Sequence, residues 1–109
     1  VNPRLHHGTL NAMFLPAVIR FNASSDSMLK ERRLERMAHA MGLSSANDIG
    51  AAIKDMNARL GLPTGLAAMG VHAGMFDQII VGAMADHCHK TNPRIATEDE
   101  YRDMLTQAL

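Results

Sequence analysis

The sequence contains a single cysteine and lacks tryptophan, paired metal-binding cysteines and long apolar runs. Cys88 cannot form an internal disulfide, and no Cys-x-x-Cys pair is present for a structural zinc site or a redox site. No segment approaches the ~20 uninterrupted apolar residues of a membrane-spanning helix, and a secretory signal does not fit either. We therefore expect no membrane association and a reducing, cytoplasmic compartment.

Excess charge of either sign is also missing, since eleven basic residues balance eleven acidic ones. A chain without surplus positive charge is poorly suited to neutralise nucleic-acid phosphates, so we expect no nucleic-acid partner. The 109 residues are 47% hydrophobic and 20% charged, as in one globular domain. Nine methionines against three phenylalanines and one tyrosine predict an aliphatic, adaptable core.

Helical periodicity dominates the chain, and the alternation typical of strands is absent. The sequence therefore predicts an all-α fold, a helical bundle of about five to six helices. One apolar face is complete from Leu10 to Phe21, and Pro16 inside it predicts a kink or a change of helical pitch. We expect this face to be exposed in this chain and covered by self-association in a homo-oligomer.

Turn and capping residues divide the rest of the chain into further helices. A second helix is expected from Ser25 or Asp26 to Gly42, and a third from the Ser44/Ser45 cap to Gly61. A short connector follows at 64–70, and the next helix should end between Asp86 and His89. Thr97 and Glu100 predict a capping box for the last helix. The expected core residues of the second to last helices are Leu34, Met37, Ala38, Met41, Ile49, Ala52, Ile53, Met56, Leu60, Phe76, Ile79, Ile80, Ala83, Met84, Tyr101, Met104, Leu105 and Ala108.

Common catalytic motifs are missing, because the sequence has no GxGxxG, GxxxxGK[ST], GxSxG or HExxH pattern. Histidine clusters are the remaining candidates. His6 and His7 open the first helix, where neighbouring side chains diverge and only one can face a given site. A helix N-terminus favours neutral imidazole, the metal-binding form. On spacing alone, however, a plain surface or capping histidine is the preferred interpretation, because one ligand does not make a site.

The second cluster is His87-Cys88-His89. On a helix its two histidines differ by about 200°, which argues against a chelate. The simpler interpretation is a helix end at which His89 and Lys90 offset the C-terminal dipole and Cys88 packs as a small buried residue. His39 and His72 are isolated and are interpreted as structural.

Three stretches carry a more specific signal through their order and separation. They are HHGTLNAMFLPAVIRFN, ARLGLPTGL and ADHCHKTNPRIATEDEYRDML. Together they resemble the C-terminal part of iron-dependent (group III) alcohol dehydrogenases, over nearly the whole chain. The matching positions are His7-Gly8, Asn11-Ala12, Leu15-Pro16-Ala17-Val18, Phe21-Asn22 and Asn92-Pro93-Arg94 before a Thr-capped helix.

This resemblance implies part of a dehydroquinate-synthase-like, iron-dependent alcohol dehydrogenase fold. Residues 1–109 would be a fragment of the C-terminal all-α, iron-binding domain, and the N-terminal NAD(P)-binding domain would be absent from this chain. The family binds a divalent metal, Fe²⁺ or Zn²⁺, through one aspartate and three histidines. His7 matches the last of these histidines, and the other ligands would lie upstream of Val1. Cys88 falls at a position that resembles a substrate-pocket position in some relatives.

The resemblance implies that the full-length enzyme transfers a hydride between a small alcohol or aldehyde and NAD(P). The metal would polarise the substrate oxygen. Alone, the chain is expected to be inactive and to bind neither metal nor NAD(P), because it lacks the upstream part of the enzyme as a partner. An alternative is a stand-alone helical interaction module without catalysis. A helix-turn-helix DNA binder is disfavoured by the zero net charge.

Overall fold

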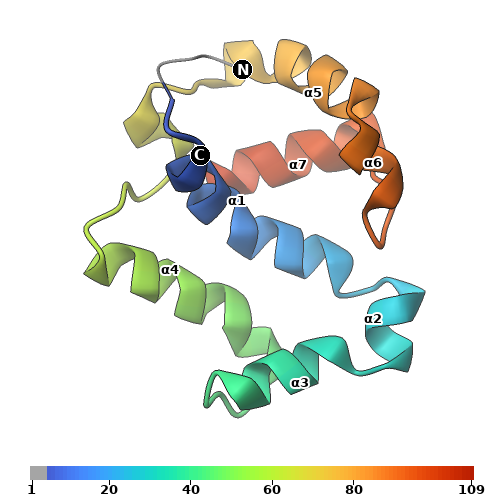
Figure 1. Cartoon of the computed structure of the whole chain (residues 1–109). Coiled ribbons are helices and arrows are strands. Elements are labelled where there is room, and N and C mark those ends of the chain that lie inside the picture. The colour runs from blue at the N-terminus through green and yellow to red at the C-terminus, as the bar shows by residue number, and fades with distance from the viewer. Residues whose placement is uncertain (1–4) are drawn as a thin grey trace.

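The computed structural model describes residues 5–109, and every regular element in this range is helical (Figure 1). This confirms the predicted all-α fold. The α-helices are α1 (His7–Asn22), α2 (Asp26–Lys30), α3 (Arg33–Ala40), α4 (Ile49–Arg59), α5 (Phe76–Ala85), α6 (His87–Thr91) and α7 (Glu98–Ala108). Three short 3₁₀ turns are η1 (Ala46–Asp48), η2 (Leu66–Met69) and η3 (Ala73–Met75). None of the helices in the described range is long and apolar enough to cross a bilayer.

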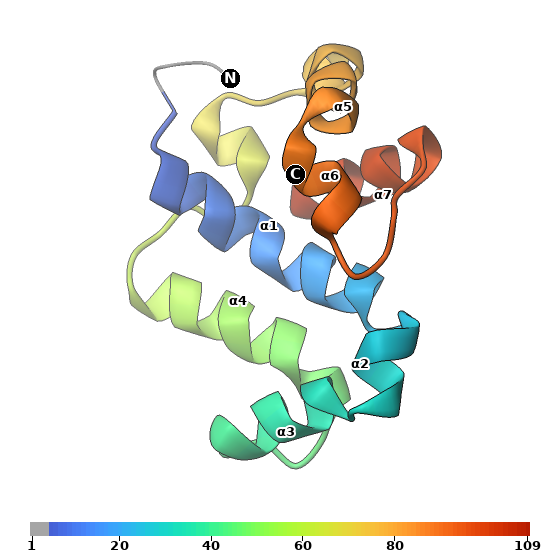
Figure 2. The same ribbon diagram turned by 45° about the vertical axis from the view of Figure 1, so that its right-hand side comes forward.

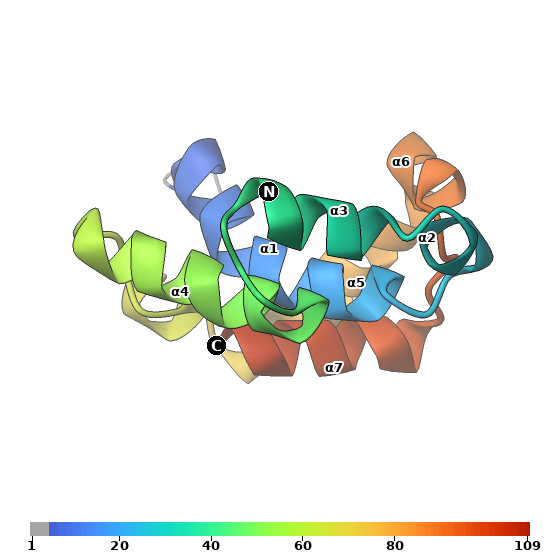
Figure 3. The same cartoon turned by 90° about the horizontal axis from the view of Figure 1, so that it is seen from below.

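Helix α1 lies at the centre of the molecule. Helices α3 and α4 pack on one side of it, and α5 and α7 on the other (Figures 1 and 2). The view from below shows α3 and α4 in front of α1, with α7 running alongside (Figure 3). A central helix must be apolar on two sides, which explains the wide apolar stripe of this segment.

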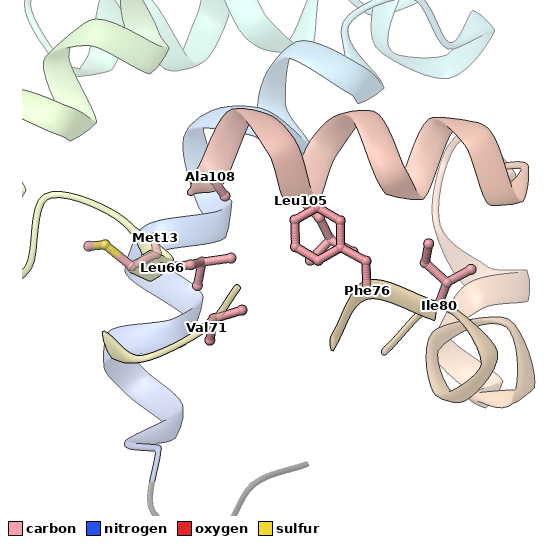
Figure 4. Packing of buried hydrophobic residues seen from close by; sticks show 7 residues of the cluster. All are labelled: Met13, Leu66, Val71, Phe76, Ile80, Leu105 and Ala108. Atoms are coloured by element: carbon pink, nitrogen blue, oxygen red, sulfur yellow. The ribbon is translucent and has the colours of Figure 1, made fainter. Parts of the chain in front are cut away.

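Three hydrophobic clusters of buried residues follow from this arrangement in the described range, and the smallest, which contains Ala17, Ala96 and Met104, joins α1 to α7. The largest one joins Met13 of α1 and Leu66 of η2 to α5 and α7 (Figure 4). In this cluster Phe76, Ile80 and Leu105 are each 3% exposed and point toward one another. The second cluster contains Ile19, Leu34, Ala38, Ile49 and Ile53, and it fastens α3 and α4 to the C-terminal half of α1.

The face from Leu10 to Phe21 is covered by this chain itself, so the expectation that it would be exposed is wrong. Its members pack with residues of η2, α5 and α7, and they are buried or half-buried. Leu15, which is not part of this face, is a large apolar residue of α1 with an exposed fraction of 43%. Helix α1 continues from His7 to Asn22 as one element that contains the buried Pro16.

The predicted second helix is two helices, α2 and α3, separated at Arg32. This residue has left-handed backbone angles, φ 51° and ψ 42°. Such a conformation costs roughly 1–2 kcal/mol for a residue other than glycine, so packing must compensate for it. The break turns α3 so that Leu34 and Ala38 reach the second cluster. Met37 and Met41, which were expected in the core, are 41% and 44% exposed.

Helix α4 presents a narrower buried face than the sequence predicted. Ser45 accepts a hydrogen bond from the Asn47 amide and caps the preceding turn η1, as expected for the Ser44/Ser45 cap. The buried stripe consists of Ile49, Ile53 and Asn57. The prediction was wrong for Met56 and Leu60, which are 44% and 67% exposed. Met56 lies beside the stripe, and Leu60 follows the end of the helix.

The last helix confirms its predicted start. The Thr97 hydroxyl accepts from the Glu100 amide at 3.2 Å, and the Glu100 carboxylate accepts from the Thr97 amide at 3.1 Å. This reciprocal pair is a capping box. The apolar residues Met104, Leu105 and Ala108 are buried, as the periodicity predicted.

Candidate functional site

The two histidines at the start of α1 have different roles. His6 is the N-cap, and its Nδ1 accepts a hydrogen bond from the Thr9 amide at 3.3 Å. This bond satisfies one of the free amides in the first turn of the helix. His6 is therefore a capping histidine, which was one of the two interpretations that the sequence left open.

His7 is the first residue of α1 and is exposed. Its Nε2 lies 3.2 Å from Nδ2 of Asn11, one helical turn later. An amide nitrogen can only donate, so Asn11 occupies the lone pair of Nε2 in this arrangement, and a metal at His7 would need this contact to change. Neutral imidazole is the form that ligates transition metals. His7 thus fits one position of a metal site, but one ligand does not make a site.

Within residues 5–109, three metal-ligating side chains come together at another place, the start of α6. That group consists of Asp86, His87 and Cys88, and it does not include His7. Any metal held by His7 must take its other protein ligands from outside the described residues.

A cavity of about 690 Å³ lies between α1, α5, α6 and α7. Its walls are mostly apolar, and its polar groups come from Gln78 of α5, from Asp86 and helix α6, from Asn92 in the turn after α6 and from Tyr101 of α7. The lining residues are Val18, Phe21, Met75, Gln78, Ile79, Gly82, Ala83, Asp86, Cys88, His89, Asn92, Ala96, Tyr101 and Met104. An apolar cavity with a few convergent polar groups is the usual form of a small-molecule pocket.

His7 and this cavity are at different places along α1. Val18, the first residue of α1 that lines the cavity, lies eleven residues after His7. That separation corresponds to about 16 Å along an α-helix. The structure therefore does not bring the predicted metal ligand and the predicted pocket residue Cys88 into one site within the described chain.

The segment around Cys88 differs from the sequence interpretation. Helix α5 ends at Ala85, and Asp86 starts the separate helix α6, where its carboxylate accepts from the Cys88 amide at 2.8 Å. The extended backbone of Asp86, with ψ 142°, breaks the helix, because the aspartate takes the N-cap conformation. Cys88 is exposed rather than buried, and it borders the cavity.

Hydrogen bonds with Asp86 govern the ionisation of the thiol. The side-chain hydrogen bond with the Asp86 carboxylate, then burial, then the negative charge of Asp86 raise the pKa of Cys88. In turn, the hydrogen bonds from Cys88 and the charge of His87 outweigh desolvation and lower the pKa of Asp86. The local charge therefore favours carboxylate and neutral thiol.

His89 and Tyr101 form a polar pair in the cavity wall. His89 Nδ1 lies 2.8 Å from the Tyr101 hydroxyl, and the ring centroids are 5.6 Å apart. Burial, with a smaller contribution from the charge of Asp86, raises the pKa of Tyr101. Sequence reasoning placed His89 at a helix end and Tyr101 in the core. No local pattern links these two residues, because only the packing of α6 against α7 brings them together.

Two motifs that were recognised separately in the sequence contact each other. Asn92 donates to Oδ1 of Asn22 at 2.7 Å, and Asn22 donates back at 3.2 Å. Arg94 donates to the Phe21 carbonyl at 3.1 Å and pairs with Glu100 at 2.9 Å. Its guanidinium also lies 4.1 Å from the centre of the Phe21 ring. The Phe-Asn and Asn-Pro-Arg motifs thus form one structural unit that joins the end of α1 to the start of α7.

Comparison with protein families decides the relationship. Residues 2–109 match the model described as Fe-containing alcohol dehydrogenase family, C-terminal. The chain belongs to this family. The two motifs that meet at Arg94 and the His7-Gly8 start of α1 are therefore features of an iron-type alcohol dehydrogenase C-terminal domain.

Curated iron-type relatives are dehydrogenases. A 4-hydroxybutyrate dehydrogenase of Cupriavidus necator is 53% identical over 96% of this chain, which corresponds to 28% of the relative. An NADPH-dependent butanol dehydrogenase of Clostridium saccharobutylicum is 31% identical over 91% of the chain and 27% of the relative. An NAD-dependent methanol dehydrogenase of Bacillus methanolicus is 29% identical over 97% of the chain and 29% of the relative. The chain thus spans less than a third of the length of these relatives. No solved structure matches it.

Proposed function

We propose that the chain is the C-terminal part of a longer iron-type dehydrogenase that transfers a hydride between a small alcohol or aldehyde and NAD(P). The observation that carries the proposal is the family match over residues 2–109, together with the identity to dehydrogenases named for alcohols and for 4-hydroxybutyrate. Because the chain spans only 28% of the 4-hydroxybutyrate dehydrogenase, the nicotinamide-binding domain would belong to the upstream part. These relatives do not favour the alternative of a stand-alone interaction module.

In this proposal His7 supplies one ligand to a divalent metal, Fe²⁺ or Zn²⁺. When bound, such a metal acts as a Lewis acid on the substrate oxygen and eases the loss of the alcohol proton. The chain contributes positioning: the His6 cap holds the first turn of α1, and Asn11 restrains the His7 ring from one turn further on. With its side-chain amide turned so that Oδ1 accepts from Nε2–H, Asn11 would orient a His7 ring that binds the metal through Nδ1.

Cys88 is proposed to border the substrate pocket. Support comes from its position in the wall of the cavity, beside the Tyr101 and His89 pair. The apolar walls suit the carbon chain of a small alcohol. The cytoplasmic location and the homo-oligomer stay predictions. For the oligomer, Leu60, Val81 and Ile95 are the most exposed large apolar side chains after α1 and α2, at 67%, 69% and 55%.

The test is a comparison of two histidine variants in the longer enzyme. His7→Ala should remove tight metal binding and nearly all turnover, because one of four ligands is lost. His6→Asn is the matched control, since asparagine keeps an N-cap acceptor. Metal content and the rate of alcohol oxidation are measured on the same preparations. Full metal occupancy and near-normal turnover in His7→Ala would refute the assignment, most clearly if His6→Asn lost both.

A further inference from the structure

The start of α6 gathers three different metal-ligating side chains on consecutive residues. Ligand atoms of Asp86, His87 and Cys88 all lie within 4.8 Å of one another. His89, which the sequence placed in this cluster, turns instead to the Tyr101 hydroxyl. His89 therefore does not share a site with His87. Asp86, on the other side of His87 in the sequence, lies close enough to do so. The two histidines diverge as the sequence predicted, and Asp86, which the sequence analysis did not consider as a ligand, joins His87 and Cys88 instead.

Distances within the group suit a tetrahedral ion. The Cys88 sulfur lies 3.5 Å from Nε2 of His87. A zinc ion with bonds of about 2.3 Å to sulfur and about 2.0 Å to nitrogen places these two atoms about 3.6 Å apart. Oδ1 of Asp86 lies 3.7 Å from Nδ1 of His87. These two contacts use different ring nitrogens of His87, and one ion binds only one of them, so the imidazole or the carboxylate must rotate to bring the three ligands to one centre. Both side chains are free to do so, because His87 is 90% exposed and Asp86 is 54% exposed.

The cap of α6 also arranges the group in advance. Oδ1 of Asp86 accepts the Cys88 amide at 2.8 Å, which holds the carboxylate beside the thiol. That bond leaves the second carboxylate oxygen for an ion. An outer hydrogen bond of this type fixes the orientation of a ligating carboxylate.

We propose that Asp86, His87 and Cys88 form a binding site for a borderline-soft divalent cation of the zinc class, separate from the metal position of His7. Thiolate, imidazole and carboxylate together select such ions, whereas Mg²⁺ and Ca²⁺ require more oxygen ligands than one aspartate provides. Three protein ligands leave the fourth position open. The site modifies the expectation that the chain alone binds no metal.

The position of the site gives it a consequence for the cavity. Asp86 and Cys88 line the cavity, whereas His87 is not among its lining residues. A bound ion would therefore lie at the edge of the cavity, with its open position available to water or to a ligand within it. Binding would also deprotonate the thiol, because a metal ligates thiolate.

The experiment is a calorimetric titration of the reduced, metal-free chain with Zn²⁺ alone. One equivalent should bind with a dissociation constant in the micromolar range or tighter. His87→Ala and Cys88→Ser should each weaken binding at least about tenfold. Asp86→Asn keeps an acceptor for the α6 cap and should weaken binding by removing the charged ligand. An excess of Mg²⁺ should not compete.

Two further variants serve as controls. His89→Ala should keep the site, because His89 is bonded to Tyr101, and His7→Ala should keep it because His7 lies outside the group. Co²⁺ provides a second readout, since a thiolate-to-cobalt absorption band should appear in the unaltered chain and vanish in Cys88→Ser. Helical circular dichroism is recorded for every variant. The proposal is overturned if no saturable one-to-one binding occurs in the folded chain, or if His89→Ala loses as much affinity as His87→Ala. Neither result bears on His7 in the longer enzyme.

Discussion

Asn57 of α4 provides the hydrogen bond that Pro16 of α1 cannot make. The Asn57 amide donates to the carbonyl of Ala12 at 3.0 Å. Ala12 lies four residues before Pro16, so in a regular helix its carbonyl would accept from the amide of residue 16, which proline lacks. Asn57 is only 6% exposed, so its polar side chain is buried and makes this hydrogen bond in place of hydrogen bonds to water. The Ala12 carbonyl, which Pro16 leaves without an amide donor within α1, thus forms a polar link to α4.

Replacing Asn57 should therefore destabilise the fold. Asn57→Ala leaves the Ala12 carbonyl without this partner and should lower the free energy of unfolding by about 1–3 kcal/mol. Urea unfolding followed by circular dichroism measures the change. Asp55→Ala is a suitable control in the same helix, because its ion pair with Arg59 is highly exposed and should contribute little.

A double-mutant cycle isolates the relationship between the two residues. Pro16→Ala restores an amide that can donate to Ala12, so Asn57→Ala should cost less in that background than in the original chain. Strictly additive effects would show that Asn57 acts only through packing and that the link to Pro16 is incorrect.

Local signals in the sequence were sufficient for most helix positions. Thr97 and Glu100 predicted the start of α7 because a capping box needs only residues within one turn. Gly42 likewise takes the predicted left-handed conformation, with φ 75°. The break at Arg32 had no such signal, since no glycine or proline is present there. It depends on the packing of Leu34 and Ala38 against α1 and α4, which a single segment cannot reveal.

The candidate site shows the same division. The sequence singled out His7 and Cys88 by residue type and resemblance, and it also identified Asn92 and Arg94 as a motif. The pairing of His89 with Tyr101 joins residues on different helices, so no periodicity predicts it. Asp86 was overlooked as a cap because the apolar pattern of α5 continues to Ala85, and no glycine or proline lies between Gly82 and Asp86.

Gly65 and Leu109 are in such close contact that a side chain at position 65 is excluded. An ideal Cβ on Gly65 would clash with the Leu109 carbonyl oxygen. Gly65→Ala should push η2 away from the end of α7 and disrupt the bond from the Ala67 amide to Leu109 at 3.1 Å. We expect a loss of about 1–3 kcal/mol, as is typical of overpacking.

The matched control for this prediction is Gly82→Ala. A Cβ at Gly82, within α5, meets no atom within 4 Å. Alanine should therefore stabilise the helix, by up to about 1 kcal/mol. Thermal unfolding should show a lower Tm for Gly65→Ala and an unchanged or higher Tm for Gly82→Ala. Equal Tm values in both variants would contradict the close contact at Leu109.

The thiol of Cys88 should react more slowly at neutral pH than an ordinary surface cysteine. Its pKa is raised, chiefly by the hydrogen bond with the Asp86 carboxylate, so a smaller fraction is thiolate at a given pH. Asp86→Asn removes the negative charge and should move the pH profile of alkylation by iodoacetamide to lower pH, with a severalfold faster reaction near neutrality. Because the chain has one cysteine, the measured rate belongs to this residue alone.

Asp77→Asn, which changes an acid bound to Arg102 on the α5–α7 surface, should leave the profile where it is. The reaction is run with a chelator, because an ion bound at α6 would create thiolate and block alkylation at the same time. An identical profile for Asp86→Asn and the unaltered chain would show that the carboxylate does not control the thiol, and that the two side chains lie further apart in solution than in this structure.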